Sequence, residues 1–145
     1  MEFYLFFVLL IILCLCTFID ISKKIIPNYL VVLILALGLI NGIIHNSLYT
    51  VFSGVFIPSL ILIILKYKIN LCYIGAGDIK LLSAIGSWVG WFLNIYIFLS
   101  ACVIALLFSL FCILFFNKSL KSVPFTPFLF ASTLSLYYLY FINIY

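Results

Sequence analysis

Long apolar runs fill most of the chain, and lysine marks the short polar segments between them. The runs cover residues 1–22, 25–65, 81–117 and 122–145, and the lysine clusters are Lys23/Lys24, Lys66/Lys68, Lys80 and Lys118/Lys121. One helical crossing of a bilayer takes about 20 residues, and the alternation typical of strands is absent. The runs therefore predict one, two, two and one crossings. This makes an all-α, polytopic membrane protein with six transmembrane helices.

The same pattern predicts a topology. Neighbouring lysine clusters are separated by two predicted crossings or by none, so all of them are expected on one side of the membrane. Lysine-bearing loops favour the cytoplasm. We therefore expect the N-terminus, the C-terminus and His45 outside, with tight turns near residues 41–47 and 91–94.

The fourth predicted helix is short, starting at about Asp78 and ending near Trp91. Gly86 and Gly90 in this helix have the GxxxG spacing that lets a second helix approach closely. Its tryptophans, Trp88 and Trp91, are expected in the aromatic belt at the outer interface, where indole rings accumulate.

Composition supports a chain that lies in lipid as one domain, residues 1–145. Hydrophobic residues make up 69% of the sequence and charged residues 7%, so no polar face remains to cover a soluble core. The net charge of +4 comes from lysines that hold loops in place, and nucleic acid is not an expected partner. The first run precedes its positive charges, which predicts an anchor with its N-terminus outside rather than a cleaved signal peptide.

Five cysteines are present, but none forms a CxxC pair. A zinc or redox site needs closely spaced, accessible thiolates. Small apolar packing is therefore the expected role of these residues, and neither a metal nor a cofactor is predicted. The cysteines are Cys14, Cys16, Cys72, Cys102 and Cys112.

Two of the three acidic residues, Asp20 and Asp78, lie where an apolar run meets a lysine-bearing segment. Acidic groups at a membrane edge are costly to keep and suggest function. The predicted topology puts both at the same depth, where packing of their helices would bring the carboxyl groups together. Such a pair shares a proton, so that one group accepts a proton from water while the other polarises a carbonyl. The residues thus predict an aspartic peptidase.

Asp78 ends the segment Gly75-Ala76-Gly77-Asp78. The two glycines permit positive φ and let a substrate backbone approach without a Cβ in the way. A simpler interpretation is that the glycines only interrupt the chain before a helix and that Asp78 caps the helix start.

Three segments together resemble the type IV prepilin peptidases. They are Asp20 with Ile26-Pro27-Asn28, then Gly75-Ala76-Gly77-Asp78-Ile79-Lys80, and then Pro124-Phe125-Thr126-Pro127-Phe128-Leu129. Their order, their spacing and the six-helix plan all agree, so the resemblance covers nearly the whole chain. Within these three segments the departure is Thr126, where the family usually has glycine.

The resemblance implies an endopeptidase that removes the basic leader from type IV prepilin or pseudopilin precursors at the cytoplasmic face of the inner membrane. It implies that Asp20 and Asp78 are the catalytic acids. It further implies that Gly75, Gly77, Lys80, Pro124 and Pro127 shape the active-site turn and the substrate site. The expected partners are the precursor and the lipid bilayer. Because no paired-cysteine region precedes the first helix, methyltransferase activity is not expected.

Two other classes of protein are compatible with paired acids in a membrane. A small transporter or proton channel would use Asp20 and Asp78 to carry ions or protons. However, both acids are expected at one face and not near the midplane. In an assembly subunit the acids would only pair with lysines such as Lys80.

Overall fold

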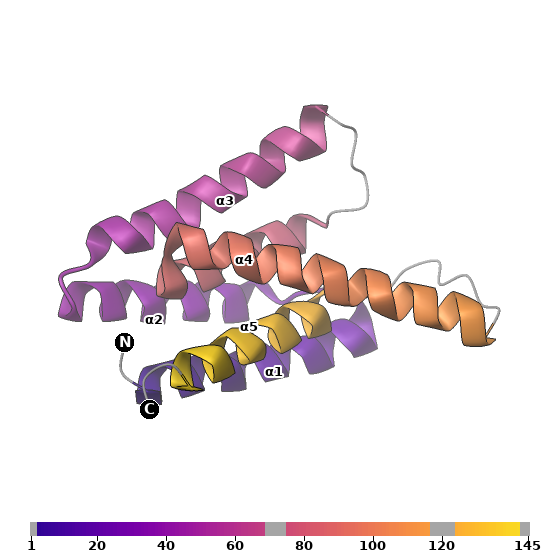
Figure 1. Cartoon of the computed structure of the whole chain (residues 1–145). Coiled ribbons are helices and arrows are strands. Elements are labelled where there is room, and N and C mark those ends of the chain that lie inside the picture. Colours follow the sequence, from indigo (N-terminus) through magenta and orange to yellow (C-terminus); the bar gives the residue numbers. More distant parts are fainter. Residues whose placement is uncertain (1–2, 69–74, 117–123, 143–145) are drawn as a thin grey trace.

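The computed structural model describes residues 3–68, 75–116 and 124–142, and helix is the regular secondary structure of these ranges. The elements are α1 (Phe3–Lys23), α2 (Asn28–Ile44), α3 (Leu48–Lys68), α4 (Ala76–Phe116) and α5 (Thr126–Ile142). Figure 1 shows that the helices run back and forth, with the start of α1 and the end of α5 at the same end of the molecule. The prediction of an all-α protein is confirmed.

A short connection joins α1 to α2. After Lys23, Lys24 adopts a left-handed backbone with φ 53°, and its N–H donates to the Asp20 carbonyl at 2.8 Å. A left-handed residue with this hydrogen bond is a common helix end. Pro27 is extended, and α2 begins at the next residue. The last turn of α1 and the first turn of α2 therefore lie close together.

The turn between α2 and α3 lies within the predicted range 41–47. The N–H groups of His45 and Ser47 donate to the carbonyls of Asn41 and Gly42, at 3.1 and 2.9 Å. His45 is exposed in this turn, at the opposite end of α2 from Asn28.

Helix α4 is broken at Gly90, where φ is 79° and ψ is 172°. Glycine is essentially the only residue that adopts this conformation. Beyond the break, the Asn94 side-chain amide donates to the Leu82 carbonyl at 2.9 Å, so the two arms of α4 lie side by side. The break falls one residue before Trp91, close to the predicted turn at 91–94.

The GxxxG spacing of α4 serves close packing, as predicted. A Cβ on Gly54 of α3 would overlap the Gly86 backbone and would lie 2.9 Å from the Gly90 Cα. Only residues without a side chain let two helix backbones come this close. The amide of Asn94 also donates to the Gly54 carbonyl at 3.3 Å. Helix α3 is thus held against both arms of α4.

The prediction for Trp88 is wrong. Its side chain is only 6% exposed, and its indole N–H donates to the Ile34 carbonyl of α2 at 2.8 Å. Trp88 therefore joins α2 to α4 inside the bundle and does not face the membrane interface. The error arises because an apolar run contains inward-facing and lipid-facing residues of the same type.

Three helices of the described ranges, α1, α3 and α4, are long and apolar enough to cross a membrane, while α2 is a shorter apolar helix. Large apolar side chains cover much of the outer surface, including Phe92 at 68% and Leu114 at 78% exposure. An outer surface of this kind is stable in lipid and not in water. The count of six crossings stays a prediction.

Candidate active site

Asp20 lies in the last turn of α1 and is buried, with 6% of its surface exposed. Its Oδ2 accepts a hydrogen bond from the backbone N–H of Thr126, at 3.3 Å. Thr126 is the first residue of α5. The first and the last helix of the chain therefore meet at this carboxyl group. The stacked rings of Phe6 and Tyr137, 5.0 Å apart, join the same two helices further along.

Asp78 lies in the first turn of α4, directly after the two glycines. The Gly75 carbonyl accepts the Ile79 N–H at 3.4 Å, which makes Gly75 the residue that precedes the helix. The Asp78 carboxyl group turns back toward the Gly75 backbone and hydrogen-bonds to it. A side chain at the third helical position often caps a helix in this way. Asp78 thus caps the start of α4, as the simpler interpretation has it. In this position its side chain is still partly exposed.

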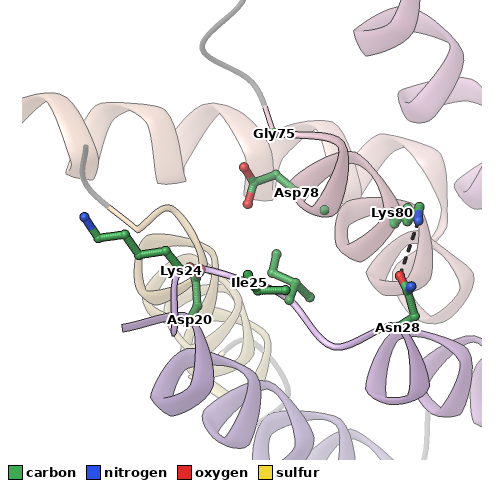
Figure 2. Close-up of a pocket in the computed structure, with 9 residues that line it drawn as sticks. Asp20, Lys24, Ile25, Asn28, Gly75, Asp78 and Lys80 are labelled. Atoms are coloured by element: carbon green, nitrogen blue, oxygen red, sulfur yellow. Dashed lines mark hydrogen bonds between the residues drawn. The ribbon is translucent and has the colours of Figure 1, made fainter. Parts of the chain in front are cut away.

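Both acids line one pocket of about 330 Å³. In Figure 2, Asp78 lies on one side of this pocket and Asp20 and Lys24 on the other. The two carboxyl groups are near enough to interact electrostatically. The remaining lining residues come from the α1–α2 connection, from α2 and from the start of α4, and they are Lys24, Ile25, Ile26, Asn28, Gly75, Gly77 and Lys80.

Gly75 and Gly77 are both pocket residues, but positive φ is not what requires glycine at either position. Among the glycines of the described ranges, only Gly90 has positive φ. A Cβ on Gly75 would lie 2.9 Å from the Asp78 Oδ2, and one on Gly77 would lie 3.3 Å from the Ile26 side chain. The expectation of positive φ is therefore wrong. Glycine is needed here for space.

Lys80 faces the same pocket from the second turn of α4. Its Nζ donates to the Asn28 Oδ1 at 3.3 Å, as Figure 2 shows. This bond joins the first turn of α2 to α4 at the pocket rim. The predicted site did not include Asn28 or Lys24, although Asn28 belongs to the Ile26-Pro27-Asn28 segment.

Pro124 and Pro127 are half-buried and are not among the residues that line the pocket. They flank Thr126, which does not line the pocket either but whose backbone N–H bonds to Asp20, a residue that does. In the sequence, Thr126 stands out only as a departure from the family pattern. A backbone contact of this type leaves no signal in the side-chain sequence.

Catalysis by a histidine-activated nucleophile or by a metal ion finds fewer suitable residues in the described ranges. His45 is at the far end of α2, away from both acids. Within residues 3–68, 75–116 and 124–142, no three His, Cys, Asp or Glu side chains are grouped so that they could hold a metal ion. Of the cysteines there, Cys16 is buried and Cys14, Cys102 and Cys112 are partly buried, while Cys72 lies outside the described residues.

Two carboxyl groups in one pocket can do the work of an acid and a base together. Like charges a few ångströms apart do not readily coexist, so such a pair tends to hold one proton. The unprotonated group can accept a proton from water, and the protonated group can donate one to a carbonyl oxygen. This chemistry suits hydrolysis of an amide.

Comparison with known proteins finds one matching family and a small number of similar proteins. The sequence pattern of the type IV leader peptidase family matches residues 7–110. The chain is 33% identical over 120 residues to a prepilin leader peptidase/N-methyltransferase of Aeromonas hydrophila, which covers 78% of this chain and 41% of that protein. A protein of the same name from Aeromonas salmonicida (strain A449) is 31% identical over 120 residues, with the same coverage. The chain thus spans less than half the length of these relatives, and no solved structure matches it.

Proposed function

The chain belongs to the type IV leader peptidase family, and on that premise we propose that it is a membrane aspartic endopeptidase. Its substrates are type IV prepilin or pseudopilin precursors, from which it removes the basic leader peptide. The observation that carries this proposal is the placement of Asp20 and Asp78, from α1 and α4, in the lining of one pocket.

In the proposed reaction the two acids act on one water molecule. The unprotonated carboxylate takes a proton from the water, and the water oxygen attacks the scissile carbonyl carbon. The other acid donates its proton to the carbonyl oxygen, and a tetrahedral intermediate forms. When this intermediate collapses, the C–N bond breaks, the acid that took the water proton gives it to the leaving nitrogen, and a hydroxyl proton of the intermediate returns to the other acid. The leader then has a new carboxyl end, and the mature protein has a new amino end.

The position of the pocket supports cleavage at the cytoplasmic face. The pocket includes Lys24 and Lys80, and it lies where α1 ends and where α2 and α4 begin. Lysines at helix ends favour the cytoplasmic side. In the proposed topology six helices cross the inner membrane, the broken α4 counting as two, and both termini are outside. A precursor whose basic leader stays in the cytoplasm then presents its scissile bond at the depth of the acids.

The apolar outer surface supports lateral entry of the substrate from the bilayer. Pilin precursors of this class carry a hydrophobic segment after the cleavage site, as the family resemblance implies. Such a segment can remain in lipid beside the apolar helices while the preceding residues enter the polar pocket. The substrate therefore does not have to leave the membrane before it is cut.

The proposal is tested with the purified chain in detergent and a pilin precursor, with the new N-terminus mapped by mass spectrometry. Cleavage between the leader and the hydrophobic segment is expected. Asp20→Asn and Asp78→Asn keep the side-chain volume but remove the acid, and each is expected to lower the rate by about 100- to 10,000-fold. Glu2→Gln changes the third acid of the chain and is the control.

Two outcomes would contradict the proposal. One is that the wild-type chain leaves every precursor of this class intact. The other is that either Asp→Asn variant, at normal abundance, cleaves at the wild-type rate. If vesicles containing the chain carried an ion or proton flux that depends on both acids and the chain cut no precursor, the transporter class would be favoured instead.

A further inference from the structure

The contact between Asp20 and Thr126 joins two helices at the ends of the chain and is shielded from solvent. Thr126 is 0% exposed and Asp20 is 6% exposed. The bond at 3.3 Å runs from the Thr126 backbone N–H to one carboxylate oxygen, Oδ2. A buried carboxylate without a donor loses much of its hydration energy without compensation. This bond therefore offsets part of the lost hydration of Asp20 and helps to hold its side chain in place.

The first turn of α5 has one N–H group left for an outside acceptor. The Phe128 N–H donates to the Phe125 carbonyl at 3.1 Å, and proline at position 127 has no N–H. The N–H groups of a first turn otherwise lack partners within the helix. Thr126 is thus the one of these three residues that can donate to a group on another helix, and Asp20 receives that bond.

The threonine side chain takes no part in this bond. The Thr126 Oγ1 is buried and has no hydrogen-bond partner among the described residues. The contact with Asp20 comes from the backbone alone. A residue of another type at position 126 can therefore make the same contact, provided that it has an N–H group.

We propose that Thr126 is a positioning residue of the active site and acts through its backbone N–H. The bond holds Oδ2 of Asp20, which fixes the side chain and leaves the other oxygen available to the pocket that Asp20 lines. The first turn of α5 is then part of the catalytic apparatus although its own side chains do not line the pocket. This inference rests on the proposed function, because positioning has meaning only if Asp20 takes part in catalysis.

Thr126→Pro is the direct test, because it deletes the N–H at a helix start, where proline is tolerated. Thr126→Val is the matched control, since it keeps the N–H and the branched shape but lacks the hydroxyl. Loss of one hydrogen bond to a charged group predicts a fall in kcat of about 10- to 100-fold in Thr126→Pro, with KM little changed. Thr126→Val is expected to cleave at close to the wild-type rate. If the threonine hydroxyl were what mattered, Thr126→Val would lose as much activity as Thr126→Pro, because both variants lack it.

A second substitution guards against misfolding of the proline variant. A backbone ester at position 126, introduced with the α-hydroxy analogue of threonine, removes the N–H without a ring. It should lower kcat as Thr126→Pro does. If the ester and proline variants both cleaved as fast as Thr126→Val, the inference would be overturned, while the proposed function would stand.

The melting temperature in detergent gives a readout that does not depend on activity. Thr126→Pro should melt at a lower temperature than Thr126→Val in the wild-type background. In an Asp20→Ala background this difference should shrink, because the carboxylate that accepts the bond is gone. An unchanged difference would count against the contact even if no substrate were found. Failure of the wild-type chain to cleave any precursor would instead remove the proposed function.

Discussion

Gly75 lies so close to the Asp78 carboxyl group that a Cβ at position 75 would be 2.9 Å from Oδ2. The carboxyl group turns back over the start of α4 and hydrogen-bonds to the Gly75 backbone. A glycine is therefore what allows Asp78 to occupy this place. The first glycine of the Gly75–Asp78 segment is therefore explained by the space that the Asp78 carboxyl group needs.

Gly75→Ala is expected to displace the Asp78 side chain and to lower kcat by about 10- to 100-fold, because small misplacements of reacting groups have effects of this size. The displaced atom is the end of a side chain, so the melting temperature should change little. Gly77→Ala is the comparison, since its Cβ would press on Ile26 at 3.3 Å and not on the acid. It should have the smaller effect on cleavage. Full activity of Gly75→Ala would contradict this account.

Gly86→Ala is expected to disrupt the packing of α3 on α4. The new Cβ would overlap the Gly54 carbonyl oxygen, a backbone atom that cannot rotate away. Overpacking of this kind destabilises by about 1–3 kcal/mol, and a clash with backbone atoms belongs at the upper end of this range. Thermal unfolding in detergent measures the effect, and Ala36→Val adds bulk at an exposed position of α2 as a control. Equal melting temperatures for the two variants would rule out the close glycine contact.

Gly90→Ala is expected to destabilise the break in α4, since φ of 79° with ψ of 172° is strained for any residue with a Cβ. The expected loss is about 1–3 kcal/mol. Asparagine tolerates left-handed helical backbone, but this ψ lies outside that region. Gly90→Asn should therefore be no more stable than Gly90→Ala. Rescue by asparagine would show that the break has a different backbone conformation.

Asn28→Ala removes the acceptor that holds the Lys80 ammonium group at the pocket rim. Lys80 can then move relative to the two acids, and we expect kcat/KM to fall by about 3- to 10-fold, as for loss of one ordinary hydrogen bond. The bond is exposed, so the melting temperature should hardly change. Tyr29→Phe alters the next, exposed residue of α2 and should leave cleavage unchanged. If the two variants cleave equally fast, the hydrogen bond between Lys80 and Asn28 does not contribute to cleavage.

Much of the helical plan could be predicted from the order of residues. Apolar runs and lysine clusters gave the helix positions, because the bilayer thickness sets how many residues one crossing takes. The turn at 41–47 and the close packing of Gly86 were predicted from local patterns. Asp20 and Asp78 stood out because acids are rare in such a chain, and the structure brings both to one pocket.

What could not be predicted depends on how the helices are rotated and packed against each other. Trp88 faces α2 and not the interface, Gly75 and Gly77 supply space and not positive φ, and the Thr126 N–H reaches Asp20. The Trp88 and Thr126 contacts join segments that are far apart in the chain, and the Thr126 contact uses a backbone N–H that every residue type except proline carries. The Gly75 contact depends on how the Asp78 carboxyl group turns back over the start of α4. Local apolar pattern determines that a helix crosses lipid. Only tertiary packing determines which of its sides meets another helix, and therefore which backbone groups reach the two acids.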